Sequence, residues 1–422
     1  MSFTQDGQFR QSRYWTLALP VEQPDPHLRE ETAAATVRDL FDESVRLRMI
    51  ADVPLGAFLS GGIDSSSVVA SMAAQSSSPV KTFSIGFEES GESELPAARL
   101  VAQKFGTDHT EIVVRPDAVN LVSRLVHFLD EPFGDSSTIP TFLVSEAAAR
   151  HVKVALTGDG GDELFWGYDS LFLIDRARRF DRLPPALRKL IRLTADHLPY
   201  SFYGKNYLRM MGRRTAVERY FDLNYSPFYL RSALLTSDWN LPADNAYLQE
   251  SFGDSLGPDD ADIVSRVAYF EATTQLTSNM LVKVDRMSMA NSLEIRCPLL
   301  DHKLAELAMT IPREWKLRGG RGKQILLKAV GRRLPPELLT LPKKGFDVPL
   351  AAWFRGSLRS FLWDHLTSRS FLERGIVSQA FLKHLLKEHD SGRRDNQHWL
   401  WMLLVLELWF QNCVQIPEIV AA

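Results

Sequence analysis

The chain has 422 residues, 45% of them hydrophobic, which is enough for a large buried core and excludes an intrinsically disordered polymer. At about 150 residues per domain, this length suggests two or three domains. The 49 Lys and Arg residues against 52 Asp and Glu residues leave a net charge of −3. That balance provides no field for holding a long polyanion, so we expect no nucleic-acid partner.

Cysteine content and the length of apolar runs indicate the cellular compartment and whether the chain spans a membrane. Cys297 and Cys413 are too few for a disulfide framework or a cysteine-built zinc site, so a reducing, cytoplasmic location is expected. The beginning of the chain is polar and lacks the apolar region of a signal peptide. The most apolar run, 399–410, is shorter than the roughly 20 residues that a membrane span needs. We therefore expect a soluble protein with no membrane partner.

In chain order, residues 1–26 carry Pro20, Pro24 and Pro26 without a hydrophobic period, which predicts an extended arm or a remnant linker. A helix is predicted over 27–50. Beyond it, short apolar runs alternate with helical patterns. The predicted strands are 54–59, 81–87, 111–114 and 152–156, and the predicted helices among them are 65–75, 94–105, 118–129 and 140–150.

This alternation predicts an α/β fold with a doubly wound, mainly parallel sheet lying mainly within residues 50–168. The strand patterns end near residue 168. Helices are expected in 170–260, 264–309 and 358–413, so residues 169–422 are predicted to be a helical elaboration of the sheet. Residues 27–422 would then form a single domain.

The first chemical motif is LSGGIDSS at residues 59–66, between a predicted strand and a predicted helix. Such a turn lies at the carboxyl edge of a parallel sheet, where ligands bind. Its two glycines let backbone N–H groups approach an anion, and its serines and the helix N-terminus add donors. Asp64 would repel a bare phosphate, but it suits a Mg²⁺ ion shared with phosphate oxygens. The usual P-loop and dinucleotide fingerprints are absent, which disfavours kinases, GTPases and dehydrogenases.

The second motif is LTGDGGDE at residues 156–163. Three glycines and three carboxylates in one loop are costly for folding alone, and a metal ion or a cationic ligand would relieve the repulsion. We take Asp162 as the partner of Asp64 for Mg²⁺. Glu163 could hold a cationic group or a second metal, and Asp159 could act as a base or a substrate contact. A solvated acidic turn would give the same pattern.

Two weaker motifs follow. Residues 283–301 alternate charges and methionines, and Asp285, Arg286 and Glu294 are candidate substrate-binding residues, although a salt-bridged, half-buried helix would look the same. Farther on, Lys323 follows a glycine-rich loop at a predicted helix start, where it could reach phosphate oxygens that develop charge during AMP transfer. A surface hairpin is the alternative for that loop.

The loop at residues 59–66 resembles that of the PP-loop ATP pyrophosphatases, whose fold is of the adenine nucleotide alpha hydrolase-like type. The whole set resembles the synthetase half of the glutamine-dependent asparagine synthetases, over residues 30–360. Besides the motifs above, the matching segments are VPLGAFL at 53–59, TFSIGF at 82–87, GTDH at 106–109, DEPF at 130–133, PLLD at 298–301 and KKGF at 343–346.

The resemblance implies that ATP activates the side-chain carboxylate of aspartate as an acyl-adenylate, releasing pyrophosphate, and that ammonia then displaces AMP. Mg²⁺ would be bound by Asp64 and Asp162, and Lys323 would stabilise charge at the α-phosphate. Asp159 and Glu163 would lie near the amino-acid substrate and the incoming amine. The pyrophosphate contacts would be Ser60, Gly61, Gly62, Asp64 and Ser65, and the adenosine contacts would be Leu59, Ile85 and Gly158.

The sequence departs from that family in three places. The family's glutaminase half begins with a catalytic cysteine after the initiator methionine, whereas this sequence begins Met-Ser-Phe, so ammonia is expected to be free or to come from a separate glutaminase chain. Trp166 stands where the family often has a small residue, which puts the shape of the substrate mouth in question. Thr157 stands where serine is common.

Two alternatives to an asparagine-forming ligase remain. The same adenylation could serve an amine other than ammonia, as in the related lactam synthetases and lasso-peptide cyclases. The chain could also be a non-catalytic nucleotide-binding module. A sulfur-transferring tRNA enzyme is disfavoured by the weak basic charge and the lack of paired cysteines.

Overall fold

A five-stranded, all-parallel sheet organises the first half of the chain in the computed structural model. The strand order is β5-β4-β3-β6-β7, and the strands are β3 (Leu55–Phe58), β4 (Lys81–Phe87), β5 (Asp108–Val114), β6 (Val154–Leu156) and β7 (Glu294–Arg296). The described residues are 1–20, 29–87, 94–114, 118–199, 202–213, 215–223, 228–240, 252–255, 257–341 and 348–414. The predicted α/β class and parallel sheet are confirmed.

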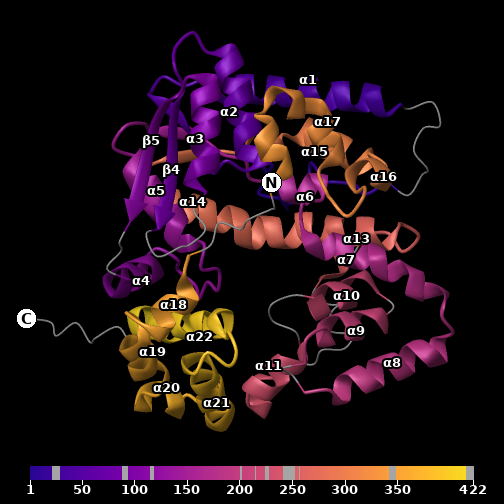
Figure 1. Cartoon of the computed structure of the whole chain (residues 1–422), viewed down its shortest axis with the longest axis vertical. Helices are drawn as coiled ribbons and strands as arrows, with labels where there is room; N and C mark the ends of the chain where they lie inside the picture. Colours follow the sequence, from indigo (N-terminus) through magenta and orange to yellow (C-terminus); the bar gives the residue numbers. More distant parts are fainter. Residues whose placement is uncertain are drawn as a thin grey trace, which may run out of the picture.

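Both faces of the sheet are covered by helices, as Figure 1 shows. In β6, Val154 and Leu156 belong to one apolar cluster and Ala155 to another, because side chains alternate along a strand. The helices of the body that contains the sheet are α1 (Glu30–Arg48), α2 (Ile63–Gln75), α3 (Leu95–Phe105), α4 (Ala118–His127), α5 (Thr138–Ala148), α6 (Gly161–Phe165), α15 (His302–Thr310), α16 (Arg313–Lys316) and α17 (Gln324–Val330).

One long helix crosses the middle of the molecule in Figure 1. It consists of α13 (Ile263–Phe270), a π-helical stretch η4 (Glu271–Met280) and α14 (Leu281–Met289). Its central stretch packs against α6, and α14 packs against α5. The helical content predicted over 264–309, with a break at Cys297-Pro298, is wrong just before that break, because residues 294–296 form strand β7 beside β6. Residues 302–309 are helical as predicted, in α15.

Two helical lobes lie below this long helix in Figure 1. The first contains α7 (Asp169–Ala177), α8 (Pro185–His197), α9 (Lys205–Met211), α10 (Ala216–Leu223) and α11 (Phe228–Leu234). The second contains α18 (Leu350–Arg355), α19 (Arg359–Leu366), α20 (Arg369–Glu373), α21 (Gln379–Asp390) and α22 (Gln397–Trp409). Much of α22 is buried, and no helix of the described residues is long and apolar enough to cross a membrane.

Short elements complete the chain. The opening residues form a two-stranded antiparallel hairpin, β1 (Ser2–Phe3) and β2 (Phe9–Arg10), and Trp15 donates a hydrogen bond of 2.7 Å from Nε1 to Glu306. The predicted boundary at residues 26/27 and the KKGF segment lie outside the described residues. The remaining short helices are η1 (Arg178–Arg182), η2 (Ser237–Trp239), η3 (Gly253–Ser255), η5 (Pro298–Leu300), η6 (Gly331–Arg333), η7 (Pro336–Thr340) and η8 (Phe410–Val414).

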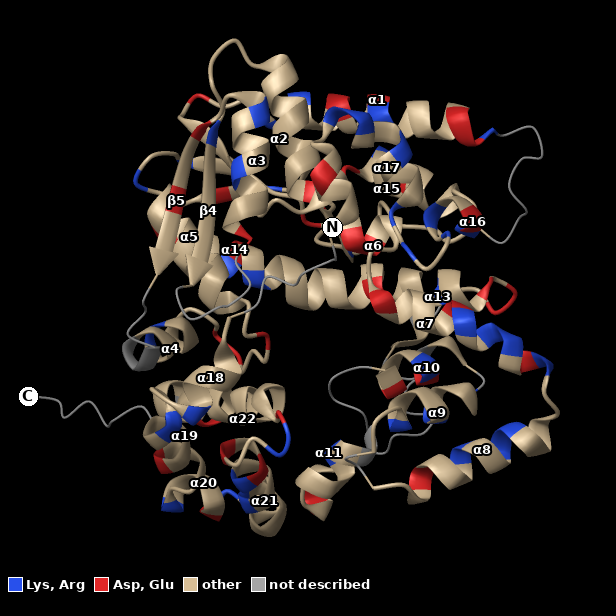
Figure 2. Ribbon diagram, viewed as in Figure 1, with Lys and Arg blue, Asp and Glu red and all other residues tan. Residues whose placement is uncertain are grey.

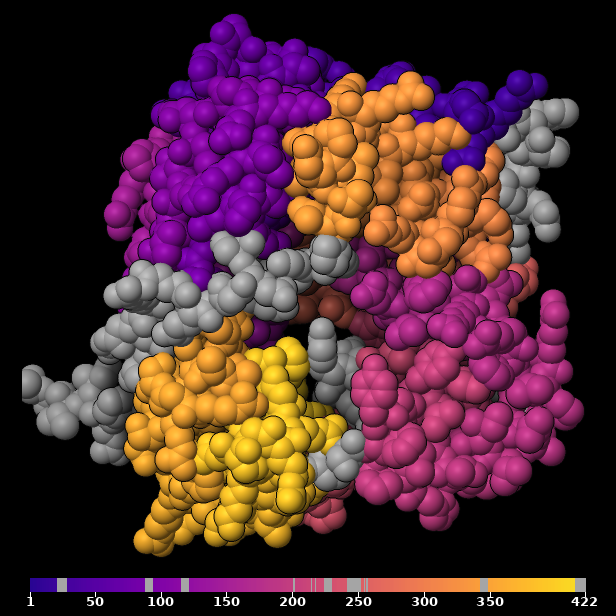
Figure 3. All heavy atoms as spheres, viewed as in Figure 1, coloured from indigo at the N-terminus to yellow at the C-terminus, as the bar shows by residue number. Residues whose placement is uncertain are grey.

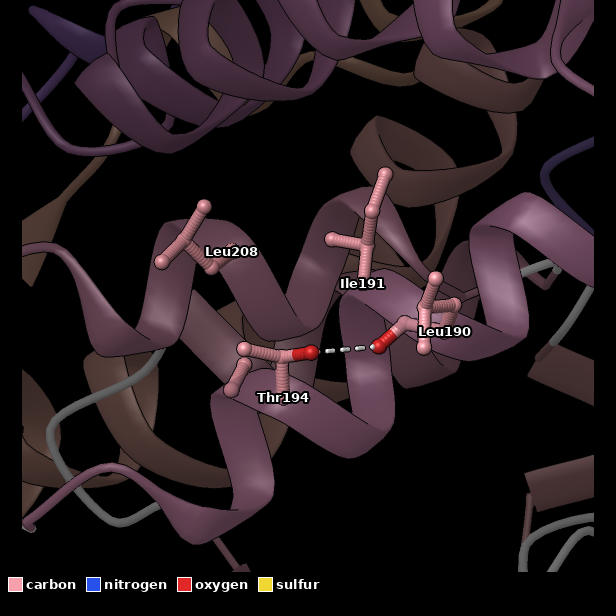
Figure 4. Close-up of a pocket in the computed structure, with 5 residues that line it drawn as sticks. Leu190, Ile191, Thr194 and Leu208 are labelled. Atoms are coloured by element: carbon pink, nitrogen blue, oxygen red, sulfur yellow. Dashed lines mark hydrogen bonds between the residues drawn. The ribbon is translucent and has the colours of Figure 1, made fainter.

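The surface has a hollow between the sheet with its surrounding helices and the two helical lobes. In the view of Figure 3, the hollow lies at the centre, between the sheet-bearing body and the two lobes. Figure 2 shows acidic and basic residues mixed over the elements, with basic residues prominent on α8. A separate apolar pocket of about 270 Å³ lies between α8 and α9. Figure 4 shows residues that line it, among them Leu190, Ile191 and Leu208. None of its lining residues belongs to the motifs described above.

Candidate active site

The loop between β3 and α2 is folded closely on itself. Gly61 has φ +77°, and a Cβ there would lie 2.6 Å from the Ala98 nitrogen, so the position requires glycine. The Ser65 hydroxyl accepts a hydrogen bond of 3.2 Å from the Ser60 N–H, and the two hydroxyls lie 3.0 Å apart. Because the N-cap residue of α2 is Gly62, no side chain caps the helix there, which suits anion binding.

The loop after β6 packs directly against this first loop, because β6 pairs with β3 and both strands end at the same edge of the sheet. A Cβ at Gly158 would lie 2.6 Å from the Ser65 nitrogen. A Cβ at Gly161 would clash with the carboxylate of Asp64. The glycines that looked costly in the sequence therefore allow the two acidic loops to touch.

Three predicted site residues meet in one charged cluster. The ammonium of Lys323 contacts the carboxylate of Asp64 and lies 2.5 Å from Oδ1 of Asp162. Burial of Lys323, which is 8% exposed, opposes its charge, but the two carboxylates outweigh burial and raise its pKa above the ordinary value. The structure thus brings together the two predicted metal ligands and the predicted phosphate-contacting lysine.

Backbone contacts place Lys323 at this point. Its N–H donates a hydrogen bond of 2.8 Å to the Phe165 carbonyl, and its φ is +58°, which is uncommon for a residue with a side chain. A Cβ at Gly322 would fall on the carbonyl oxygen of Trp166. A Cβ at Gly167 would fall on the side chains of Asp162 and Lys323. The lysine loop and the turn after α6 are therefore closely interlocked.

Glu163 is buried beside this cluster and is 2% exposed. Its Oε1 accepts a hydrogen bond of 2.6 Å from the Tyr168 hydroxyl. Burial raises the pKa of Glu163 to about 7, opposed by the bond from Tyr168 and assisted by the charge of Asp162. Such a carboxyl group can exchange a proton near neutral pH. Tyr168 belongs to none of the sequence motifs, although its position shortly after the acidic loop was a usable signal.

Asp159 lies in the same loop and is half-buried. Its Oδ2 accepts a hydrogen bond of 2.6 Å from Thr157, whose hydroxyl lies 3.5 Å from the sulfur of Cys297. Burial and the nearby charge of Asp159 raise the pKa of Cys297 to about 12, so its thiol is a poor nucleophile.

The predicted adenosine contacts lie at the carboxyl edge as well. Leu59 follows β3 and is 1% exposed, and Ile85 lies in β4 and is 6% exposed. The Ser84 hydroxyl donates a hydrogen bond to the Leu59 carbonyl, which ties the two strands together. Both apolar side chains pack into the core clusters. Their contact with adenosine, like that of Gly158, stays a prediction.

The candidate substrate residues lie elsewhere. Glu294 is exposed at the amino end of β7, paired with Val154, and therefore lies at the edge of the sheet opposite the loops. Asp285 is exposed on α14, and Arg286 forms an ion pair with Asp130. The structure does not bring these three side chains into the charged cluster.

Another buried polar group lies where α14 meets the N-terminus of α5. Lys283 is 4% exposed, and its ammonium donates a hydrogen bond of 2.8 Å to Ser137 and lies 3.5 Å from Asp135. Burial would raise the pKa of Asp135, but Lys283 and Ser137 outweigh it and lower that pKa. Because α5 leads into the parallel strand β6, its N-terminus lies on the carboxyl side of the sheet.

The parallel sheet, the tight glycine loop between β3 and α2, and the adjoining acidic loop with its lysine define the PP-loop class of nucleotide-binding α/β proteins. Comparison with protein families narrows this class: the family model described as asparagine synthase matches residues 36–411. The chain belongs to the asparagine synthase family.

Curated relatives agree with this assignment. Asparagine synthetase [glutamine-hydrolyzing] 1 of Bacillus subtilis is 32% identical over 90% of this chain and 59% of its own length. Amidase chyE of Penicillium rubens is 28% identical over 91% of this chain and 63% of its own length. The chain therefore spans about three fifths of the length of these relatives.

Proposed function

We propose that the protein is an ATP-dependent amide-forming ligase. An oxygen of a substrate carboxylate attacks the α-phosphorus of ATP, the bond to the bridging oxygen breaks, and pyrophosphate leaves. An amine nitrogen then attacks the acyl carbon, the bond from that carbon to the oxygen shared with the phosphate breaks, and AMP leaves with this oxygen. The nitrogen loses a proton. The observation that carries this proposal is Lys323 held between Asp64 and Asp162 beside the glycine loop, because these charges suit a triphosphate and its metal ion.

Mg²⁺ fits the chemistry of this donor set. Two carboxylates from adjacent loops, supplemented by substrate phosphates, are a usual set of ligands for Mg²⁺. We infer that Asp64 and Asp162 hold the ion, which would supply charge neutralisation on the phosphates. Lys323 is then the protein cation that binds phosphate oxygens, and the predicted pyrophosphate contacts in the first loop add hydroxyl and backbone donors.

Glu163 suits the second step. Its pKa of about 7 allows the carboxylate to accept the proton released when the amine nitrogen forms its bond to the acyl carbon. Tyr168 fixes one oxygen of Glu163, so the other oxygen remains to serve the reaction. Asp159 lies between Gly158 and Gly160 in the same loop and remains a proposed contact for the substrate or its amine.

We infer aspartate as the acid and ammonia as the amine, supplied freely or by a separate glutaminase chain. The support is the family membership and the name of the Bacillus relative. Small, metal-neutralised substrates also suit a chain whose net charge is only −3. Cytoplasmic location remains part of this proposal.

Pyrophosphate release tests the proposal directly. The purified chain is incubated with ATP and Mg²⁺ and with each of a panel of carboxylic amino acids and peptides, with and without ammonium. We expect release that depends on aspartate, and asparagine formation that depends on ammonium. Release driven only by another acid or a peptide would overturn the aspartate assignment and favour a different acceptor. No release with any acid would favour a nucleotide-binding module.

A further inference from the structure

Trp166 occupies an unusual position directly after α6. Its φ is +63°, a left-handed conformation that is an outlier for a bulky residue. The side chain is 2% exposed and packs in an apolar cluster with Leu171, Ile174 and Phe270. The indole therefore points into the helical core rather than narrowing the mouth of the site, which answers the question that the sequence raised.

Trp166 also contacts both ends of the loop that carries Lys323. At the beginning of this loop, the ammonium of Lys316 lies 5.0 Å from the centroid of the indole ring. At its end, Gly322 packs against the Trp166 carbonyl so closely that no Cβ would fit. Between these contacts, backbone hydrogen bonds of 3.0 and 3.1 Å pair Arg318 with Arg321. One residue thus holds a closed loop at two points.

Lys316 makes this arrangement costly for the fold. It is 2% exposed, and among the described residues its ammonium has no carboxylate or hydrogen-bonding partner, only the face of the Trp166 ring. Burial lowers its pKa to about 7. An apolar side chain of the same length would be better for stability alone, because a buried charge without an ionic partner is unfavourable.

Two costly features at one point, the strained Trp166 backbone and the buried Lys316, suggest a role in function. We propose that Trp166 and Lys316 are positioning residues for Lys323. By holding both ends of its loop, they keep the Lys323 ammonium at the two carboxylates. This inference rests on the proposed function, because such positioning matters for catalysis only if Lys323 acts on ATP phosphates.

The charge of Lys316 can be removed while its length is kept. In Lys316→Met we expect an unfolding temperature equal to or above that of the wild type. We also expect the kcat of pyrophosphate release to fall about tenfold, which is a modest misplacement effect, while KM for ATP changes less than about twofold. Lys316→Arg, which keeps the cation over the indole, is expected to recover most of the activity. Trp166→Leu, which removes the ring, is expected to lower kcat as Lys316→Met does, but with a lower unfolding temperature, because it leaves a cavity in the apolar cluster.

Lys205→Met is the matched control, since Lys205 is a buried lysine of the α8–α9 hairpin, 5% exposed. Its ammonium donates hydrogen bonds of 2.6 Å to the Leu198 carbonyl and 3.3 Å to the Asp196 carbonyl. Its replacement should lower the unfolding temperature and leave kcat unchanged. A purely structural role for Lys316 would give the same result as this control: a change in stability without a change in kcat.

Chemical labelling provides a readout that does not depend on turnover. Acetic anhydride is applied to the folded chain, and acetylation of Lys323 is followed by mass spectrometry. We expect at least fivefold faster labelling of Lys323 in Lys316→Met than in the wild type. Wild-type labelling and wild-type kcat in both Lys316→Met and Trp166→Leu would overturn the inference and leave the proposed function standing. If the wild type released no pyrophosphate with any acid, the proposed function would fail, and labelling would still decide the positioning.

Discussion

Glu163 is the carboxyl group whose protonation this site alters most clearly. Its pKa is about 7 in the folded chain, against 4.5 for an ordinary glutamate, because burial disfavours the charge. The folded state therefore binds this proton more tightly than the unfolded state. The resulting contribution to stability is complete below pH 4.5 and is lost as the pH rises through about 7.

Glu163→Gln is consequently expected to separate stability from activity. A shift of this size corresponds to about 3 kcal/mol, so the variant should gain up to that much stability over the wild type between pH 5 and pH 8. Urea unfolding at the two pH values measures this gain. In the same variant, amide formation should fall by about 10²-fold while pyrophosphate release persists, because only the second step needs the base.

The wild type supplies the comparison for the pH dependence. At a constant concentration of free ammonia, its rate of amide formation should rise with pH and level off above about 7, as Glu163 becomes ionised. The variant should lack this rise. If Glu163→Gln kept the pH profile of the wild type, Glu163 would not be the base. If the variant's gain in stability over the wild type were the same at pH 5 and pH 8, the raised pKa of Glu163 would be contradicted.

Residue types that carry strong local chemistry were the ones predictable from the sequence. Asp64, Asp162 and Lys323 were predicted from motifs far apart in the chain, and the structure brings them together. The position of Glu294 away from the site could not be predicted, because a charged residue near a motif does not reveal at which edge of the sheet it lies. The contact between Lys316 and Trp166 was also not predictable from the sequence, since it depends on how α16 packs against the turn after α6.

At the scale of elements, the strands with apolar runs were predicted well. β3 lies within its predicted range and β4 matches its predicted range. Strands covered on both faces of a sheet are continuous apolar runs, which are easy to recognise in a sequence. Strand β7 was missed, since three residues with Glu294 and Arg296 at its ends give no apolar run. The π-helical stretch η4 was not predictable either, because nothing in its sequence distinguishes the wider hydrogen-bonding pattern of a π-helix from that of an α-helix.

The close contact between the loop after β3 and the loop after β6 predicts that a larger residue at the contact will impair ATP binding. In Gly161→Ala, the new Cβ would clash with the Asp64 carboxylate, so the loops must separate. We expect KM for ATP to rise about tenfold and kcat to fall, because the metal-binding carboxylates move apart. Steady-state kinetics at saturating Mg²⁺ measures both quantities.

Gly331→Ala is the control for this glycine. Gly331 has φ −60°, and a Cβ there would meet its neighbours only at 3.8 Å or more, which is ordinary contact. This variant should retain wild-type kinetics and gain slightly in stability. Wild-type kinetics in Gly161→Ala would mean that the close approach of the two loops does not matter for ATP binding.

On the scale of the whole molecule, the site lies where separate parts of the chain converge. Asp64 comes from the first quarter of the sequence, Asp162 follows β6, and Lys323 arrives after the long helix and α16. The sheet, and not the sequence order, brings them to one edge. A ligand that binds this edge therefore connects parts of the chain that would otherwise separate on unfolding.

This convergence predicts how ligands affect global stability. A ligand that binds only the folded chain stabilises it by about 2.7 kcal/mol when its concentration is 100 times Kd. Thermal unfolding of the wild type should therefore shift upward with ATP and Mg²⁺ together, and much less with ATP and EDTA. In Asp64→Asn, the chain should stay folded because Lys323 keeps its contact with Asp162, but the magnesium-dependent part of the shift should disappear. Equal shifts in the variant and the wild type would show that Asp64 does not hold the metal ion, and would place the ion elsewhere at this edge of the sheet.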